Sequence, residues 1–349
     1  MLQITELLEP TPSRLWRLVK QAGVDEVVTL LEDSEQKSRW LKKDAQSFVP
    51  VPFDAPPKGE RPWELADLRH LRDSYSEYGL KVTVVEDGPP LDDARLGGPK
   101  RDEQIEWLFA QLRAMGELGI KTLCYSWSAR SSWSRTDTDI PLRGGAITTG
   151  YDEAKMQNAP PLIEPGSVTT DDLWRNLEYF LQAVVPVAEE AGVQLALHPD
   201  DPPIPEIRGV PRIVGSPEAF DRVLETVNSE VNGITLCQGN FRLMTDDLPS
   251  VIRRYGNQKK IFFVHFRDVA GDVHRFVEVF HDAGPTDMLE CMRAYHDVGF
   301  DGPMRPDHVP AFEGESGRDF GYATLGRLHA IGYIAGLREA TYGKPGTSN

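Results

Sequence analysis

The hydrophobic pattern of the chain repeats one unit, an amphipathic helix followed by a glycine and a short aliphatic run. Residues 11–22 show the helical part, because Leu15, Val19 and Ala22 share one face and a glycine follows directly. The aliphatic run at 24–30 has the length of a strand that is buried on both faces. Helices that alternate with such strands are typical of a parallel sheet covered by helices.

The same unit continues to the end of the chain without a change of composition. Further strands are expected at 80–86, 120–125, 193–197, 233–236, 260–264 and in a run ending at Met304, and further helices at 63–78, 102–118, 170–191, 217–229, 248–255, 287–298 and 322–340. This alternation predicts one α/β domain, residues 1–349, and a (β/α)₈ TIM barrel fits it best, although the pattern places no eighth strand. A doubly wound open sheet is the alternative, but its Gly-x-Gly-x-x-Gly turn is absent after the first predicted strand.

Two segments are too long and too polar to be ordinary connections. Residues 32–59 are rich in proline and charge and have no clear period, and residues 126–167 hold tryptophans among many serines and threonines. Long loops in a compact domain often cover or line a functional site. We therefore expect two long loops, of which the second is either a lid or an ordinary surface excursion.

Composition limits the class of protein. The 349 residues are 40% hydrophobic and 26% charged, and no apolar run is long enough to span a membrane. The formal charge of −16 would repel a phosphate backbone, and no basic stripe is interleaved with aromatics, so nucleic acid is not expected as a partner. Only three cysteines, and a start without a basic segment before an apolar one, predict a cytoplasmic protein.

Four predicted strands in succession end in side chains that bind metals. His198 follows the run 193–197, and Cys237, His265 and Asp307 follow the next three strands. Taken singly, a buried histidine or cysteine is more often a packing residue than a ligand. Neighbouring barrel strands bring their carboxyl ends together, so the four are expected to converge and to hold a first-row ion such as manganese, iron, cobalt or zinc.

Three more side chains near the last predicted strand are candidates for chemistry. Arg305 offers a planar fork of donors for a carboxylate, or it pairs with a neighbouring acid. His308 can carry a proton near neutral pH. Tyr322 precedes the last predicted helix, where it is either functional or a packing aromatic.

Several blocks of the sequence resemble the metal-dependent mannonate dehydratase family, and they occur in the family's order. The similarity covers most of the chain beyond Leu80 and is strongest from Leu195 onward. The blocks are His198-Pro199-Asp200-Asp201-Pro202-Pro203, Gly209 to Val214, Asn232 to Cys237, Met304-Arg305-Pro306-Asp307-His308, and Gly321-Tyr322 with Gly326-Arg327-Leu328. Residues 123–125 and 133–137 also resemble the family's third-strand region.

What the resemblance implies is a barrel of the xylose isomerase group and a hydro-lyase of hexuronate catabolism. The enzyme would convert D-mannonate, or a closely related aldonic acid, to 2-keto-3-deoxy-D-gluconate and water. Its implied features are Mn²⁺ or Fe²⁺ at His198, Cys237, His265 and Asp307, catalytic roles at Arg305, His308 and Tyr322, a small sugar acid as partner, and a homo-oligomer. The sequence departs from the family after the strands at 24–30 and 80–86, where histidines are missing, and after Cys237, so the exact sugar acid stays open.

Two other functions remain as alternatives. A sugar isomerase or epimerase has the same scaffold, but such sites typically use several carboxylate ligands, and a cysteine ligand fits them poorly. A non-catalytic sugar-acid binding protein would explain the altered loops. The first alternative predicts a product of equal mass, and the second predicts binding without turnover.

Overall fold

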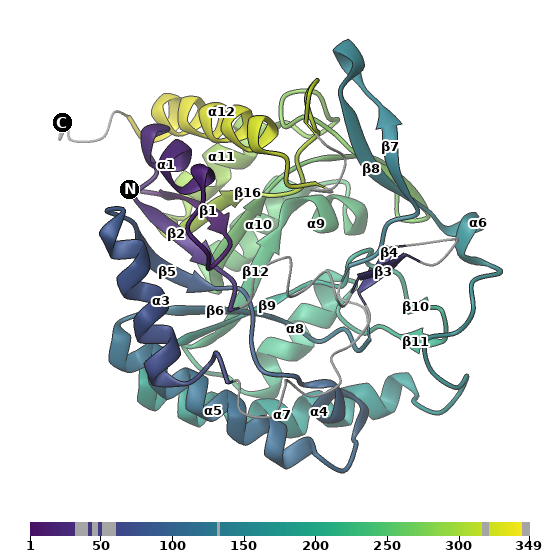
Figure 1. Ribbon diagram of the computed structural model, residues 1–349. Helices are drawn as coiled ribbons and strands as arrows, with labels where there is room; N and C mark the ends of the chain where they lie inside the picture. The colour runs from purple at the N-terminus through teal and green to yellow at the C-terminus, as the bar shows by residue number, and fades with distance from the viewer. Residues whose placement is uncertain (32–40, 44–47, 51–60, 131–132, 316–320, 344–349) are drawn as a thin grey trace.

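A closed barrel of parallel strands forms the centre of the molecule (Figure 1). The computed structural model describes residues 1–31, 41–43, 48–50, 61–130, 133–315 and 321–343. In their order around the barrel the strands are β1 (Gln3–Leu8), β16 (Pro303–Pro306), β13 (Ile261–Phe266), β12 (Asn232–Cys237), β9 (Gln194–His198), β6 (Thr122–Ser126), β5 (Lys81–Val85) and β2 (Glu26–Thr29). The predicted (β/α)₈ barrel is confirmed.

The strand that the hydrophobic pattern did not place is β1, at the start of the chain. It closes the barrel by pairing in parallel with β16 on one side and β2 on the other. Polar residues interrupt its apolar run: Thr5 and Glu6 are both buried, and the Glu6 carboxylate lies 3.8 Å from the Arg327 guanidinium. A strand with two buried polar residues has no clear aliphatic period, which is why it was missed.

Helices cover the outside of the barrel, and the apolar residues between them and the strands form the main core. The longer helices are α1 (Arg14–Gln21), α3 (Leu65–Glu77), α5 (Arg101–Leu118), α7 (Thr170–Ala191), α8 (Pro217–Thr226), α10 (Leu248–Asn257), α11 (Met288–Asp297) and α12 (Thr324–Tyr342). Short helices occur in connections, namely α4 (Asp92–Leu96), α6 (Glu153–Met156), α9 (Gln238–Met244) and a 3₁₀ turn, η1 (Arg143–Gly145). Within the described residues, no helix has the length and apolarity needed to cross a membrane.

A second, antiparallel sheet lies beside the barrel. It contains, in spatial order, β14 (Val269–Asp272), β15 (Arg275–Glu278), β8 (Ile147–Asp152) and β7 (Asp137–Pro141). Residues 126–167, expected to be irregular, therefore supply two of its strands, and Figure 1 shows β7 and β8 projecting away from the barrel. The sheet connects the segment after β6 with the segment after β13.

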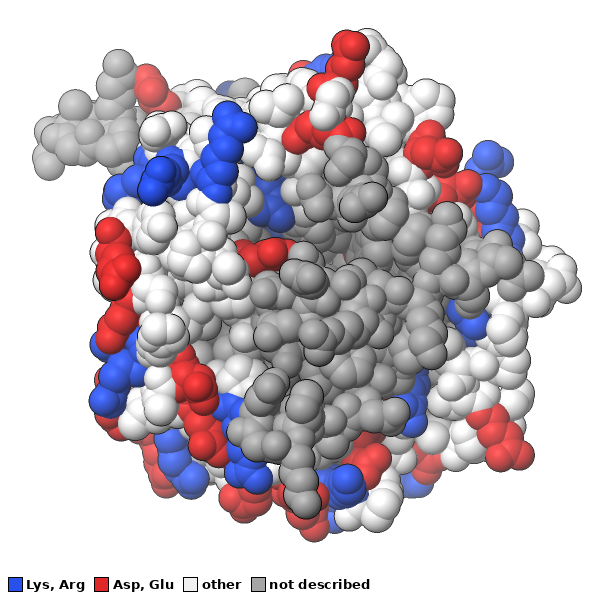
Figure 2. Space-filling view, viewed as in Figure 1, with Lys and Arg blue, Asp and Glu red and all other residues white. Residues whose placement is uncertain are grey.

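Other strands are short. The loop predicted at 32–59 lies largely outside the described residues, which include there only the pair β3 (Leu41–Lys43) and β4 (Phe48–Pro50). A further pair, β10 (Glu206–Ile207) and β11 (Val210–Pro211), follows β9. On the face drawn in Figure 2, acidic and basic side chains are interspersed.

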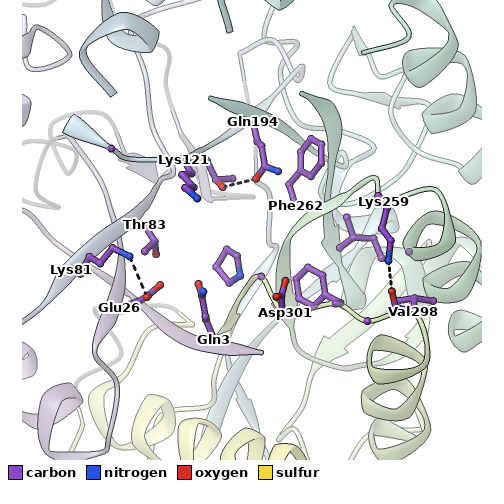
Figure 3. Close-up of a pocket in the computed structure, with 18 residues that line it drawn as sticks. Gln3, Glu26, Lys81, Thr83, Lys121, Gln194, Lys259, Phe262, Val298 and Asp301 are labelled. Carbon is purple, nitrogen blue, oxygen red and sulfur yellow. Dashed lines mark hydrogen bonds and ion pairs between the residues drawn. The ribbon is translucent and has the colours of Figure 1, made fainter. Parts of the chain in front are cut away.

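The two ends of the barrel differ. An apolar cluster that includes Leu7, Val84, Ala196 and Phe263 fills the interior. At the N-terminal ends of the strands lies a cavity of about 350 Å³, lined by charged residues such as Lys121 and by apolar ones such as Phe262 (Figure 3). At the carboxyl ends lie the residues singled out above as candidates for chemistry.

Candidate active site

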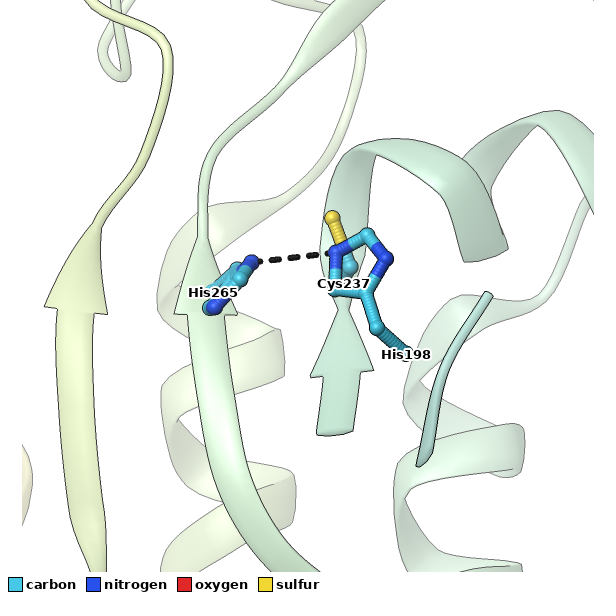
Figure 4. A group of neighbouring side chains, drawn as sticks. All are labelled: His198, Cys237 and His265. Atoms are coloured by element: carbon cyan, nitrogen blue, oxygen red, sulfur yellow. Dashed lines mark hydrogen bonds between the residues drawn. The ribbon is translucent and has the colours of Figure 1, made fainter. Parts of the chain in front are cut away.

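Three of the predicted metal ligands meet at the carboxyl end of the barrel. His198 ends β9, Cys237 ends β12, and His265 lies one residue before the end of β13. Their candidate ligand atoms all lie within 4.8 Å of one another (Figure 4). Ligand atoms that lie about 2.0–2.3 Å from one tetrahedral ion are roughly 3.3–3.8 Å apart, which is within this limit. The three side chains therefore fit one first-row ion.

The imidazole of His198 is oriented by the backbone. Its Nδ1 donates to the carbonyl oxygen of Pro199, 2.7 Å away, which leaves the lone pair on Nε2. This Nε2 lies 3.2 Å from Nδ1 of His265. A backbone carbonyl behind one ring nitrogen is the usual support of a histidine ligand, because it fixes the tautomer that binds metal.

The Cys237 thiol is completely buried, yet its environment favours the thiolate. Burial alone would raise its pKa, but the charge of Arg267 lowers the pKa to about 5. The thiolate is the form of cysteine that binds metal. In contrast, burial raises the pKa of both Cys124 and Cys291, which stay neutral thiols at pH 7.

Asp307, directly after β16, joins the group from the fourth strand. Its Oδ2 lies 3.6 Å from Nδ1 of His265 and 3.9 Å from Sγ of Cys237. Its Oδ1 accepts hydrogen bonds from the Tyr322 hydroxyl at 2.9 Å and from Nη1 of Arg305 at 2.8 Å. Burial opposes ionisation of this acid, but the surrounding cationic side chains hold its pKa well below the usual range. One carboxylate thus connects the metal group with two of the candidate catalytic residues.

Tyr322 reaches Asp307 because the chain folds back after β16. The Val309 amide donates to the Gly321 carbonyl at 2.7 Å, which sets Tyr322 beside the strand end. Gly321 has a φ of +77°, and a Cβ there would lie 3.3 Å from the His308 ring. His308 itself has a φ of 37°, which residues other than glycine rarely adopt, and such strained backbone tends to cluster at functional sites.

The His308 ring contacts a carboxylate of the second sheet. Its Nδ1 lies 3.0 Å from Oε1 of Glu278, at the end of β15, and its Nε2 lies 3.7 Å from Oδ1 of Asp307. Nη2 of Arg135 is also 3.2 Å from Nδ1, but the carboxylate is nearer, so we assign the proton to Nδ1. The lone pair on Nε2 then faces the side of Asp307.

A buried network of four charges lies next to His308. Arg267 donates to Glu278 and to Asp201, each at 2.9 Å, and Arg135 donates to the same two acids. Buried charges are tolerated when they are paired in this way, and two cations here balance two anions. Sequence reasoning missed this network. Arg267, two residues after His265 at a strand end, was the available signal; nothing pointed to Glu278.

Arg305 already donates hydrogen bonds to two acidic side chains. Its Nε and Nη2 donate to both oxygens of Glu86, directly after β5, at 3.0 and 2.8 Å. Its Nη1 donates to Asp307 and to the carbonyl of Pro306. These bonds use four of the five N–H groups of the guanidinium. The pairing of Arg305 with a neighbouring acid is therefore present, and its contact with a substrate carboxylate stays a prediction.

A family model described as D-mannonate dehydratase (UxuA) matches residues 14–165 and 162–344. The chain belongs to the D-mannonate dehydratase family. Mannonate dehydratase 2 of Halalkalibacterium halodurans is 36% identical over 304 residues, which cover 80% of this chain and 88% of that protein. Mannonate dehydratase of Thermotoga neapolitana is 36% identical over 329 residues, 84% of this chain and 90% of that protein.

Solved structures agree with this membership. The crystal structure of mannonate dehydratase from Streptococcus suis serotype 2 has a TM-score of 0.83 and 30% identity, and the match covers 100% of this chain and 95% of that one. An L-ribulose 3-epimerase, at 16% identity and a TM-score of 0.59, shares the fold. The predicted family and its hydro-lyase class are confirmed.

The departure from the mannonate dehydratase family after Cys237 serves packing. Gly239 is shared with the family, and a Cβ there would lie 2.3 Å from Nη1 of Arg267 and displace that guanidinium. Oδ1 of Asn240 accepts from Nη2 of Arg267 at 3.0 Å, and Phe241 is fully buried. These α9 residues support Arg267 and the core.

Proposed function

We propose that this protein dehydrates D-mannonate to 2-keto-3-deoxy-D-gluconate and water, with Mn²⁺ or Fe²⁺ as its cofactor. The observation that carries the proposal is the meeting of two imidazoles, a thiolate and a carboxylate at four adjacent strand ends, next to a histidine and a tyrosine. The mannonate dehydratase names of the relatives support the substrate. The four ligands would be His198, Cys237, His265 and Asp307.

The reaction removes a proton from the carbon beside the carboxylate and hydroxide from the next carbon. The resulting enol tautomerises to the keto acid. Proton removal is hard because the neighbouring carboxylate is already negative. An ion held by the four ligands would supply positive charge where the second negative charge develops.

Two side chains next to Asp307 would move the protons. Burial raises the pKa of Tyr322 far above the usual range, so its phenol keeps its proton and is suited to protonate the leaving hydroxide. His308, with Nδ1–H directed to Glu278, presents the Nε2 lone pair and is suited to take the proton from carbon. Each transfer would contribute about 10²- to 10⁴-fold in rate.

Arg305 would supply fixed positive charge. Because Glu86 and Asp307 occupy most of its donors, it would contact the substrate carboxylate through the N–H that these bonds leave over. Its bond to Oδ1 of Asp307 also keeps that carboxylate turned with Oδ2 toward His265.

Product analysis tests the proposal. The purified protein, loaded with Mn²⁺ or Fe²⁺, is incubated with D-mannonate and with a panel of other aldonic acids. We expect a keto acid lighter than the substrate by one water, formed fastest from D-mannonate. A product of equal mass would instead indicate an isomerase or epimerase, and binding without turnover would indicate a sugar-acid binding protein.

A further inference from the structure

We propose that Glu86 is a positioning residue that couples the metal ligand His265 to Arg305. The proposal rests on the proposed function for the roles of those two partners. Glu86 follows β5, and β5 lies directly across the barrel from β13, which carries His265. Its side chain therefore spans the site and does not simply pair with a neighbour on the same strand.

Both partners approach the same carboxylate oxygen. Oε1 of Glu86 lies 2.8 Å from Nη2 of Arg305 and 3.3 Å from Nε2 of His265. The second oxygen, Oε2, accepts from Nε of Arg305 at 3.0 Å. A movement of this carboxylate would thus displace the imidazole and the guanidinium together.

His265 needs such a partner. Its Nδ1 faces His198 and Asp307, which leaves Nε2 on the opposite side of the ring. This Nε2 is buried and has no well-aligned hydrogen bond in the described residues, and Glu86 is the acid beside it. A carboxylate behind a histidine ligand fixes the tautomer and the ring orientation, and its loss typically costs about 10- to 100-fold in metal affinity or activity.

The side chain of Glu86 is 17% exposed, whereas those of His265 and Arg305 are each 1% exposed. Glu86 can therefore be replaced without placing a new group in the core. Arg305 would still be paired with Asp307 at 2.8 Å, so no fully unpaired buried charge would remain. We expect variants at this position to fold.

A second cation is the rival explanation for this cluster. Ligand atoms of Glu86, Cys124 and His265 also lie within 4.8 Å of one another. Two observations favour positioning: burial raises the pKa of the Cys124 thiol, and the Arg305 guanidinium lies on both oxygens of Glu86. A cation at this place would have to displace that guanidinium.

The test measures Mn²⁺ binding to the metal-free protein by calorimetric titration, together with kcat and KM for D-mannonate at saturating Mn²⁺. For Glu86→Gln, which keeps the size and removes the charge, we expect about 10- to 100-fold weaker Mn²⁺ binding and a similar fall in kcat, with a smaller change in KM. For Glu86→Asp, which keeps the charge but shortens the reach, we expect a smaller loss in the same direction.

The matched control is Asp87→Asn, which changes the next carboxylate in the same way; that side chain accepts from the Gly88 amide. It should leave Mn²⁺ affinity and kcat unchanged, and wild type should bind one Mn²⁺ per chain. Unchanged Mn²⁺ affinity in Glu86→Gln, or in Glu86→Asp if the first variant does not fold, would overturn the proposal. Two Mn²⁺ per chain in wild type and one in Glu86→Gln would also overturn it, because Glu86 would then be a ligand.

The two proposals can fail separately. If wild type with Mn²⁺ does not dehydrate D-mannonate while Glu86→Gln still weakens Mn²⁺ binding, the dehydratase proposal fails and the positioning role of Glu86 stands.

Discussion

The two ends of the barrel are built from the same strands but differ in how deeply their charged side chains are buried. At the N-terminal end, charged side chains line an open cavity of about 350 Å³, and the pair between Lys81 and Glu26 is 3.5 Å long with the lysine largely exposed. At the carboxyl end, Arg305, Asp307 and Arg267 are almost completely buried, and the two arginines contact their acids at 2.8 to 3.0 Å.

Volume alone therefore does not identify the site. The cavity offers room but only ordinary surface charges, which solvent screens. The carboxyl end concentrates buried groups whose ionisation is shifted by their neighbours, which is typical of functional sites in barrels. We therefore expect substitutions at the two ends to have very different consequences for catalysis.

The largest effect is expected for Cys237→Ser. Serine is not ionised at neutral pH, so the charged, soft ligand that we propose is lost and a buried hydroxyl replaces it. The loss should exceed the roughly 10- to 100-fold that is typical for residues behind a ligand, so activity should fall to background. Elemental analysis measures the bound metal, and an assay of keto-acid formation measures the activity.

Cys291→Ala serves as the control for Cys237→Ser, since Cys291 is buried in α11 within the core. It should lower stability but retain the metal content of wild type. Full metal content together with full activity in Cys237→Ser would remove Cys237 from the ligand set.

Arg305→Lys should have the next largest effect. Lysine keeps the charge but cannot bind both oxygens of Glu86 and Oδ1 of Asp307 at once. We expect kcat to fall by roughly 10²- to 10³-fold, the size of effect seen when a fixed donor to developing charge is removed. Arg253→Lys, which alters a surface ion pair with Asp297, is the control and should leave kcat and KM unchanged. Unchanged kcat and KM in Arg305→Lys would make Arg305 structural only.

The residues at the carboxyl ends of the strands were easier to predict than the ion-pair network that supports them. His198, Cys237, His265 and Asp307 could be found because strand periodicity ends at each of them, and parallel strands carry their ends to one place. The network that supports them depends on contacts between distant segments. Arg135 and Glu278, for example, are 143 residues apart in sequence. No local sequence pattern indicates such a pair.

The fold could likewise be predicted only in part. Strands buried on both faces, such as residues 194–198, appear as aliphatic runs, and their helices have one apolar face. The strand β1 does not appear as an aliphatic run. Its residues Thr5 and Glu6 are buried and polar, and their fit depends on partners elsewhere, such as Arg327. The strands β7 and β8 of the second sheet were missed because their residues are mostly polar.

A smaller effect concerns the ionisation of Cys237 in the metal-free protein. Its folded pKa of about 5 lies below its ordinary value of 9.0, so the thiolate stabilises the fold above pH 9, and this contribution is lost as the pH falls toward 5. The thiolate ultraviolet absorbance of wild type, minus that of Cys237→Ser, should therefore disappear near pH 5. Disappearance near pH 9 would show that Arg267 does not stabilise the thiolate.

The smallest effect is expected at the N-terminal end, for Lys121→Gln. Lys121 lines the cavity and is exposed (Figure 3), so its charge is screened by solvent and its removal should change stability by less than about 0.5 kcal/mol. The apolar cluster around Phe263 separates this end from the proposed ligands, and kcat, KM and Mn²⁺ affinity should equal those of wild type. A tenfold change in kcat, about 1.4 kcal/mol, would show that the cavity is coupled to the chemistry and that the two ends of the barrel do not act independently.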